Sequence, residues 1–407
     1  MSAADAAPVD APALEGIVER LATRGATALA TIDDDALLRA WSATVEAFLD
    51  PDSPERRAIE PALVESTGLS PAGLKAGLAA VLGGVREPHA AALFARAAPL
   101  RLEHDGRRAP ALVILAGNIP GLVVQPLLPA LALRRPLLVK SASLEPCFAP
   151  AFVKALVARL PALADAVAAV SWPGGDEELE APLLAAVDTV LAYGDRAAVA
   201  DLQRRAPGKV VDYGPKLSFA VVGRDAELEP AARGIARDVA LFDQRGCLSV
   251  QAAFVEGDGA RARDFAAALA TGLAQAAVEL PPGRFDAQQA SAVHQLRGDA
   301  ELRGALIGPL PLATGTVLLE VPEAPLTPSP GLRTVRVHPL PNLAELSARL
   351  AGWQPLLQGV ALAGANAWLL APTLATLGVS RCALPGELQS ADAAWHNGGH
   401  DPLVVLA

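Results

Sequence analysis

Short apolar runs alternate with amphipathic stretches from about residue 100 onwards, and this rhythm limits the fold more than any other feature. Helical stretches lie between most of the apolar runs, and repeated strand–helix–strand units predict a parallel sheet covered on both faces. Sheets of this kind bind ligands in the loops that follow the carboxyl ends of their strands. The predicted strands of this series are 111–116, 136–140, 166–171, 188–192, 209–212 and 217–223.

A second α/β series follows Cys247. The proline-rich stretch 321–331 falls inside it and is predicted to be an exposed loop. Before about residue 98, apolar residues recur at three- and four-residue spacing, which predicts helices. The predicted elements of the second series are strands over 250–257, 315–320, 333–337 and 356–364, and helices over 260–278, 342–352 and 366–376.

Two segments near the start of the first series could form a hairpin and a membrane span. Residues 101–115 are expected to form a hairpin that turns at Asp105-Gly106. The uncharged run 111–133 is long enough to span a bilayer, but its prolines would break a helix, and Asn118 and Gln125 would lie in lipid. We therefore expect a buried strand, a tight turn and a packed helix, and no membrane span.

Composition excludes several classes of protein. The 34 Lys+Arg residues are scattered among 44 Asp+Glu residues, so no basic stripe favours a nucleic-acid partner. With 52% apolar residues the chain is not mainly disordered, and 407 residues suit more than one domain. The three cysteines, Cys147, Cys247 and Cys382, form no C-x-x-C pair, which excludes a disulfide framework and a cysteine-rich zinc site. We therefore expect no metal site. We expect a cytoplasmic chain with reduced cysteines and without a secretory signal.

The candidate ligand-binding residues follow the predicted strands. Neither common nucleotide fingerprint is present, but anions also bind at helix N-termini after strands. Lys140-Ser141, Trp172 to Gly175 and Tyr193 to Asp195 occupy such places in consecutive units. Each alone is typical of a turn, and together they favour an anion site.

Two further residues stand at junctions that suit catalysis. Cys247 lies between a predicted helix and a strand, next to Gly246, where a thiol can act as a nucleophile if a positive neighbour such as Arg245 or a helix dipole lowers its pKa. A lone cysteine is more often a small buried hydrophobe, and that interpretation stays open. Asn118 ends a buried strand, where its amide can donate to an oxyanion or form an ordinary turn.

Five short motifs occur in order along the chain: AGNIPGL, LLVKSASLEP, VLAYG, YGPKLSF and DQRGCLSVQ. Together they resemble motifs of the acyl-CoA reductase (LuxC-type) family within the aldehyde dehydrogenase superfamily. The likeness runs from about residue 100 to the end and includes GVSRCALPGELQ and WHNGG. The resemblance implies an aldehyde-dehydrogenase-like α/β fold, with a Rossmann-type cofactor domain, an α/β catalytic domain and a helical N-terminal region.

The resemblance also implies domains and residue roles. The helical region is expected over 1–99, the cofactor domain over 100–243 and the catalytic domain over 244–380, with 381–407 returning to the cofactor or oligomerisation region. Cys247 matches the family's nucleophile and Asn118 its oxyanion donor. The residues implied to bind the cofactor are Lys140, Ser141, Ser143, Gly174, Gly175 and Gly194.

Departures from the superfamily pattern bear on the reaction. Asp212 stands where aldehyde oxidisers carry the glutamate that activates water, and its shorter side chain suits a reductase. Ser143 stands where NAD-preferring members carry a glutamate, which implies NADPH, with NADH as the alternative because Glu145 is near.

The implied activity is therefore the NADPH-dependent reduction of an acyl thioester to an aldehyde through an acyl-cysteine. The thioester is one of coenzyme A or an acyl carrier protein, and a homo-oligomer or a partner enzyme that supplies the acyl group stays open. Two alternatives remain: an aldehyde dehydrogenase that uses Asp212 as its base, and a catalytically silent member of the fold. The second draws on the missing ribose-binding glutamate and on Asn397, where relatives often have aspartate.

Overall fold

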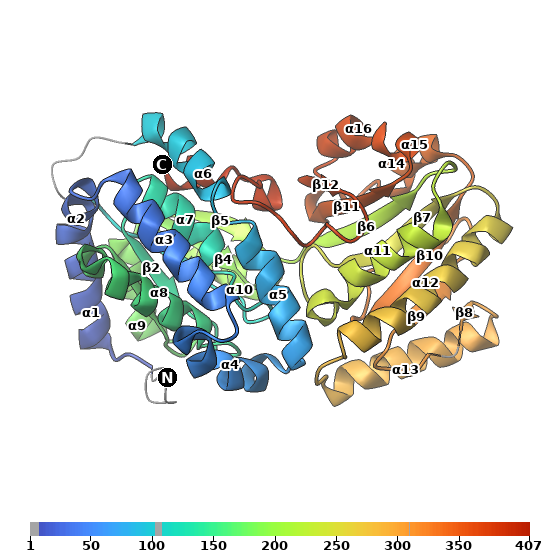
Figure 1. Cartoon of the computed structure of the whole chain (residues 1–407), viewed down its shortest axis with the longest axis horizontal. Coiled ribbons are helices and arrows are strands. Elements are labelled where there is room, and N and C mark those ends of the chain that lie inside the picture. Colours follow the sequence, from blue (N-terminus) through green and yellow to red (C-terminus); the bar gives the residue numbers. More distant parts are fainter. Residues whose placement is uncertain (1–7, 102–107, 309) are drawn as a thin grey trace. The chain divides into compact units, whose positions relative to one another are not determined.

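The computed structural model describes residues 8–101, 108–308 and 310–407. Their backbone divides into two compact units, which are described separately (Figure 1). The described parts of Met1–Thr67, Leu78–Pro215 and Ala391–Ala407 make up the first unit. Gly68–Gly77 and the described part of Lys216–Ser390 make up the second unit.

The first unit is built on a five-stranded parallel sheet with the order β3-β2-β1-β4-β5. Each strand overlaps a predicted one, so the predicted parallel sheet is confirmed. The central register pairs Ala111 of β1 with Leu137 of β2 and Thr189 of β4. The strands are β1 (Ala111–Ile114), β2 (Leu137–Lys140), β3 (Val167–Val170), β4 (Thr189–Tyr193) and β5 (Lys209–Tyr213).

Helices cover both faces of this sheet because the direction of strand addition reverses after β3. Right-handed crossovers place α7 and α8 on one face and α9 and α10 on the other. Leu112, Leu138 and Val190 lie side by side on β1, β2 and β4, and they pack against α1, α9 and α10. The bounds are α1 (Ala11–Arg20), α7 (Val124–Ala132), α8 (Phe148–Arg159), α9 (Glu177–Ala186) and α10 (Arg196–Arg205).

The region before residue 98 is helical, as predicted. Of these helices, α3 and α4 pack on α8, and α6 packs on α7 (Figure 1). The buried Trp41 of α3 meets Phe152 of α8 edge to face, and its indole N–H donates to the Val85 carbonyl over 2.8 Å. The segments are η2 (Leu21–Gly25), α2 (Ala26–Ala30), α3 (Asp34–Leu49), α4 (Pro54–Thr67), α5 (Pro71–Gly83) and α6 (His89–Ala97), and near the C-terminus η8 (Asn397–Gly399) and α17 (Pro402–Leu406).

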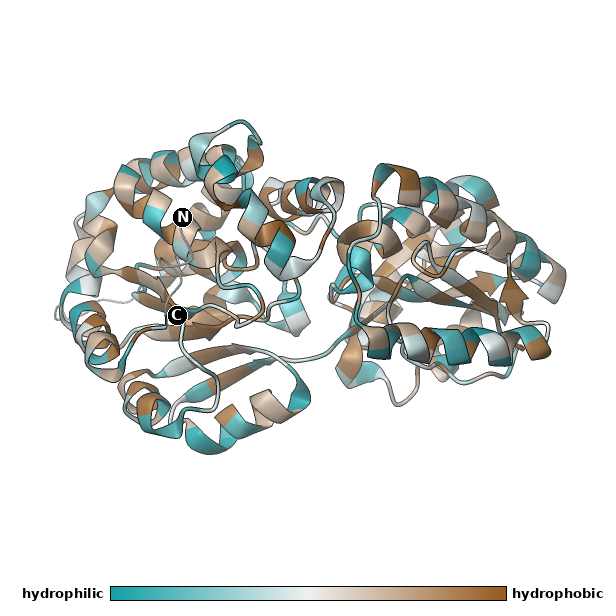
Figure 2. Cartoon of the chain, turned by 90° about the horizontal axis from the view of Figure 1, so that it is seen from below, coloured by the Kyte–Doolittle hydropathy of each residue, from teal (hydrophilic) through white to brown (hydrophobic). Residues whose placement is uncertain are grey.

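The second unit is built on a seven-stranded sheet with the order β12-β11-β6-β7-β10-β9-β8, in which only β8 is antiparallel to its neighbour. Its strands, like those of the first sheet, are largely apolar (Figure 2). The strands are β6 (Leu217–Val222), β7 (Val250–Glu256), β8 (Leu306–Ile307), β9 (Thr316–Leu319), β10 (Thr334–Leu340), β11 (Leu357–Ala363) and β12 (Arg381–Ala383).

Two groups of helices enclose the second sheet. Alternate strand residues such as Phe219, Phe254 and Val360 form a core with α14, α15 and α16. Helices α11 and α12 pack together and against β6, β7, β9 and β10. The bounds are α11 (Leu228–Ala240), η5 (Leu241–Gln244), α12 (Gly259–Glu279), α13 (Ala287–Leu302), η6 (Leu343–Glu345), α14 (Leu346–Arg349), η7 (Gln354–Leu356), α15 (Ala365–Trp368) and α16 (Ala371–Thr376).

The structure corrects some local predictions. The helix predicted over 366–376 is two short helices, because Pro372 begins a new first turn in α16. Helix α13 and the short strands β8 and β12 were not predicted. The turn expected at Asp105-Gly106 lies outside the described residues, and β1 has parallel neighbours on both sides, which leaves it no place for a hairpin partner.

The uncharged run 111–133 forms β1, a turn and α7, as the preferred interpretation predicted. In the described parts of the chain, no helix combines the length and the apolar character that crossing a membrane requires. The proline-rich stretch 321–331 is a loop between β9 and β10, which confirms that prediction.

We expect Gly84→Ala to destabilise the first unit. A Cβ at Gly84 would overlap the carbonyl of Ala391, and the Gly84 carbonyl accepts a hydrogen bond from Ala393 N–H over 2.9 Å. The expected loss is about 1–3 kcal/mol in the free energy of unfolding, measured by denaturant titration. Gly83→Ala is the matched control, because a Cβ at Gly83 meets open space. Equal stability of the two variants would contradict this packing.

Candidate functional site

The candidate cofactor residues lie at one edge of the first sheet. Lys140 is the last residue of β2, and Gly194 follows β4. Asn118 follows β1 after a short turn, in which the Cβ of an alanine at Gly117 would come within 2.7 Å of the Leu144 Cβ. The strand order reverses between β1 and β4, and ligands of such sheets bind at this switch point. The structure thus brings the candidates of this unit to one edge, as the sequence predicted.

Lys140 is buried beneath an aromatic ring. Its ammonium lies 5.3 Å from the centroid of the Trp172 ring, a cation–π arrangement. The Trp172 indole N–H donates to Glu180 over 3.0 Å, and Glu180 also accepts from Arg205 over 2.6 Å. Burial lowers the pKa of Lys140, while the Glu180 carboxylate acts in the opposite direction. The side chain of Lys140 is therefore held in place by β2, Trp172 and α9.

The loop after β2 separates its polar groups. Ser141 is buried, and its hydroxyl has no hydrogen-bond partner among the described residues. Ser143 is exposed. The carboxylate of Glu145 accepts from the N–H groups of Cys147 and Phe148, each over 2.8 Å, at the start of α8. Burial raises the pKa of Glu145 to about 7, against the effect of these two N–H groups. The Glu145 carboxylate therefore caps the N-terminus of α8.

The glycine loops after β3 and β4 are open but carry their own carboxylates. A Cβ at Gly174 or Gly175 would meet open space, although Gly175 has a φ of +80° that favours glycine. Asp176 and Asp195 cap α9 and α10 by accepting from the N–H groups three residues on. These two helix N-termini therefore offer less to an anion than the sequence suggested.

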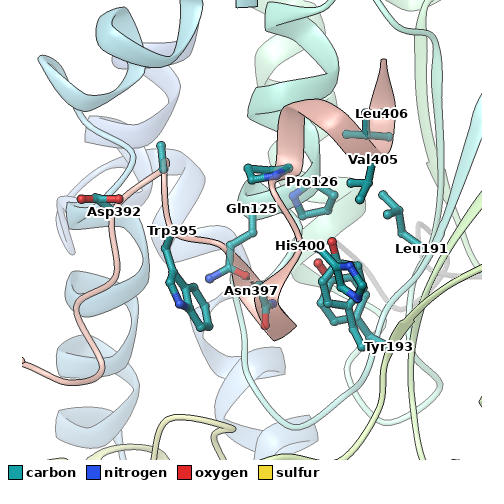
Figure 3. Close-up of a pocket in the computed structure, with 13 residues that line it drawn as sticks. Gln125, Pro126, Leu191, Tyr193, Asp392, Trp395, Asn397, His400, Val405 and Leu406 are labelled. Atoms are coloured by element: carbon teal, nitrogen blue, oxygen red, sulfur yellow. Dashed lines mark hydrogen bonds between the residues drawn. The ribbon is translucent and has the colours of Figure 1, made fainter. Parts of the chain in front are cut away.

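A small pocket, partly open to solvent, lies near the carboxyl ends of β4 and β5. Tyr193 and Tyr213 stack with ring centroids 4.5 Å apart, and His400 meets Tyr213 edge to face. Figure 3 shows Tyr193 and His400 among the lining residues. Asn397 donates to Gln125 over 3.2 Å. The lining residues are Gln125, Pro126, Leu191, Tyr193, Tyr213, Asp392, Ala393, Trp395, Asn397, His400, Pro402, Val405 and Leu406.

Asp212 is committed to a turn. It is the exposed, next-to-last residue of β5, and its Oδ1 accepts from the Gly214 N–H over 2.6 Å. This hydrogen bond gives the side chain a structural partner of its own.

Cys247 lies in the second unit, in the loop between η5 and β7, and is half-buried. The preceding Phe242, Asp243 and Gln244 have φ values of 57°, 51° and 64°. Non-glycine residues in this left-handed region cost about 1–3 kcal/mol each and persist only where the surroundings fix them. No local sequence pattern predicts this conformation.

Buried side chains supply that support. The Gln244 amide donates to the carbonyls of Val250 and Thr334 over 2.8 and 2.7 Å, and its oxygen accepts from Thr334 N–H. The Asp243 carboxylate pairs with the buried Arg333 over 2.6 Å. These contacts tie the turn before Cys247 to β7 and β10.

The backbone around Cys247 is fixed from the other side as well. Ser218 Oγ donates to the Cys247 carbonyl over 2.7 Å. The Gly246 N–H donates to Ser249 Oγ over 3.2 Å, and Ser249 Oγ accepts from Gln389 over 2.8 Å. Gln389 belongs to the GELQ run that the resemblance had singled out.

Asp238 of α11 holds that run. Its carboxylate accepts from the N–H groups of Gly386 and Leu388 over 2.7 and 3.1 Å. Burial raises the pKa of Asp238 to about 7, against the effect of these hydrogen bonds. Helix α11 therefore supports the loop of Cys247 through a chain of buried polar contacts.

The thiol itself has one side-chain partner that sequence reasoning missed. Gln358 of β11 places Nε2 3.7 Å from the Cys247 Sγ. Burial raises the pKa of Cys247 to about 11, while Gln358, the backbone at 247 and 248, and Lys216 act in the opposite direction. Arg245, which the sequence offered as a positive neighbour, instead donates to the Arg284 carbonyl over 3.1 Å. The signal for Gln358 was a polar residue inside an apolar strand.

The other two cysteines are also half-buried free thiols. Burial raises the pKa of Cys147, and Glu145 adds to the shift. Burial also raises the pKa of Cys382 in β12, against the effect of Arg381. Neither residue has the polar framework that surrounds Cys247.

Comparison with solved structures places the fold. A putative methylmalonate-semialdehyde dehydrogenase from Sinorhizobium meliloti 1021 matches with a TM-score of 0.73 and 14% identity, over 98% of this chain and 89% of that one. An NADP-dependent enzyme of E. coli matches with a TM-score of 0.72 and 15% identity, over 93% and 83% of the two chains. The predicted aldehyde-dehydrogenase-like α/β fold is confirmed.

Comparison of sequences places the family. The long-chain acyl-protein thioester reductase of Vibrio harveyi is 32% identical over 150 residues, 36% of this chain and 31% of that protein. The protein of the same name from Photorhabdus laumondii is 29% identical over 150 residues, with the same coverage. The match thus spans about a third of the curated relatives' length. The family model described as acyl-CoA reductase (LuxC) matches residues 68–407, and the chain therefore belongs to the acyl-CoA reductase (LuxC) family.

Proposed function

We propose that the protein reduces an acyl thioester to an aldehyde with a nicotinamide cofactor, through an acyl group carried on Cys247. Membership of the acyl-CoA reductase (LuxC) family carries this proposal. The hydrogen bonds that fix the loop of Cys247 support it, because a nucleophile must be placed accurately relative to the carbonyl it attacks. The relatives from Vibrio harveyi and Photorhabdus laumondii, which are named long-chain acyl-protein thioester reductases, agree with it.

The first unit fits a nicotinamide cofactor. Lys140 provides a fixed positive charge at the carboxyl end of β2, and the buried Ser141 hydroxyl lacks a partner among the described residues. Both groups suit the hydroxyls and phosphates of a dinucleotide, and Gly174, Gly175 and Gly194 leave room for close approach of a ligand to the backbone. The two solved neighbours are described as bound to NAD and as NADP-dependent. When bound, the cofactor supplies the hydride.

The chain's own part in the reaction is covalent. The Cys247 sulfur attacks the thioester carbonyl, a new S–C bond forms, and the C–S bond to the carrier breaks. We assign Asn118 and the Cys247 backbone N–H as donors to the oxyanion. After reduction the S–C bond to Cys247 breaks, which frees the aldehyde and regenerates the thiol. The carrier is coenzyme A or an acyl carrier protein, and NADPH is the proposed reductant.

The aldehyde-oxidising alternative has less support. It needs a base to activate water, and the Asp212 carboxylate is hydrogen-bonded to Gly214 N–H in its own turn. A reductase gains from a weak base at this place, since hydrolysis would waste the acyl group. The three free cysteines support a cytoplasmic setting.

The central test is Cys247→Ala. Removing the nucleophile should lower acyl-thioester-dependent oxidation of NADPH by at least about a hundredfold, because the acyl-cysteine cannot form. Cys382→Ala is the matched control, since Cys382 is another half-buried free thiol of the second unit, and it should keep near-normal turnover. A Cys247→Ala protein that retains a tenth of the rate would contradict the assignment of Cys247 as the acyl carrier. Steady oxidation of aldehyde to acid without coenzyme A would favour the alternative.

The preference for NADPH is tested at Ser143. A carboxylate there would repel a 2′-phosphate, so Ser143→Glu should raise KM for NADPH by about tenfold or more and leave KM for NADH within about threefold. Ser143→Ala, which removes the hydroxyl but adds no charge, should change neither constant by more than about threefold. Equal effects of Ser143→Glu on the two cofactors, measured by steady-state kinetics, would refute the proposed preference.

A further inference from the structure

Gln358 is a polar residue where the fold alone would favour an apolar one. It lies in β11, is 0% exposed, and is surrounded along the strand by Leu357, Gly359, Val360 and Ala361. Burial of an amide is unfavourable unless the amide is hydrogen-bonded. The backbone carbonyl of Gln358 accepts from Ser380, and its side-chain Nε2 lies 3.7 Å from the Cys247 Sγ. The side chain is thus directed at the sulfur.

The distance between this amide and the sulfur is set by a backbone bridge. Ser218 Oγ donates to the Cys247 carbonyl over 2.7 Å and accepts from the Gly359 N–H over 3.0 Å. A Cβ at Gly359 would come within 2.7 Å of Leu248 Cδ2, so β11 and the loop lie closer than side chains would allow. One hydroxyl therefore locks the residue after Gln358 to the nucleophile's own carbonyl.

We propose that Gln358 is a catalytic residue of the proposed reductase, whose amide N–H donates to the Cys247 sulfur and stabilises it as a thiolate. This inference rests on the proposed function. In the acyl-transfer step the proton of the Cys247 thiol ends on the departing carrier thiol, so the step needs no other reactant. When the aldehyde leaves, negative charge returns to the same sulfur, and the same donor faces it.

The charges around the sulfur make such a donor valuable. Burial favours the neutral thiol and raises its pKa to about 11. Lys216 acts in the opposite direction, with its ammonium donating to the Pro355 carbonyl over 3.1 Å. Arg245 is directed toward Arg284 and Asp243. A neutral amide adds hydrogen bonding without a negative charge, which a glutamate at 358 would bring.

Alkylation of Cys247 by iodoacetamide tests the proposal in the full chain, in a Cys147→Ser/Cys382→Ser background. The rate constant at pH 9 follows the thiolate fraction. Loss of a hydrogen bond to a charged group predicts a rate about tenfold lower in Gln358→Leu. Gln358→Glu keeps the shape and should fall at least as far. The matched control is Gln251→Leu in β7, whose amide accepts from Ser329 N–H over 2.9 Å, and its rate should stay within about twofold of the parent.

The outcomes separate this inference from the proposed function, because alkylation needs neither thioester nor cofactor. Rates for Gln358→Leu and Gln358→Glu within twofold of the parent, in protein that keeps the parent's circular dichroism, would overturn the role of Gln358. An equal fall in Gln251→Leu would do the same. If Gln358→Leu does not fold, the isosteric Gln358→Glu decides. A tenfold fall in a protein whose Cys247 accepts no acyl group would uphold the thiol–amide contact and overturn the proposed function.

Discussion

A single buried hydroxyl, that of Ser218, connects the parts of the second unit on which its chemistry depends. It donates to the carbonyl of Cys247 and accepts from the N–H of Gly359, so the loop of Cys247 and β11 share one hydrogen-bonded anchor. Around this anchor, Gln244 and Asp243 hold a left-handed turn that would be unfavourable by itself. Gln389 and Asp238 hold the other side of the loop. The position of the thiol is therefore fixed by buried polar groups that belong to distant parts of the sequence.

In the first unit, the strand order determines where the candidate cofactor residues lie. A parallel sheet whose order reverses between β1 and β4 brings every strand-end loop to one edge. Lys140 is held there by β2 and by the Trp172 ring, and Glu145 is withdrawn into the start of α8. An exposed serine and a buried hydroxyl without a partner among the described residues are left at this edge. These neutral groups beside the Lys140 ammonium are the basis of the proposed preference for NADPH.

Periodicity was enough to predict most of the fold. All strands of the two sheets except β8 and β12, and the helical start, follow from apolar spacing. Lys140 and Gly194 could be placed because parallel strands end at a common edge. The contacts that hold Cys247 could not be predicted, since Gln358 and Gln244 act across many intervening residues and nothing local marks their partners. Arg245 shows that a neighbour in sequence need not be a neighbour of the thiol. Its guanidinium donates to the Arg284 carbonyl, whereas the thiol contacts Gln358 of β11. Element β12 is only three residues long and carries too little pattern to detect.

The central claim is that Cys247 carries the acyl group, and it can be observed without turnover. The protein is incubated with acyl-coenzyme A or acyl carrier protein thioesters of several chain lengths, without NADPH, and its peptides are mapped by mass spectrometry. We expect one acyl adduct per chain, on the peptide that contains Cys247, with peptides of Cys147 and Cys382 unmodified. An intact protein that forms no adduct with any of these thioesters, or that forms it on another cysteine, would contradict the account.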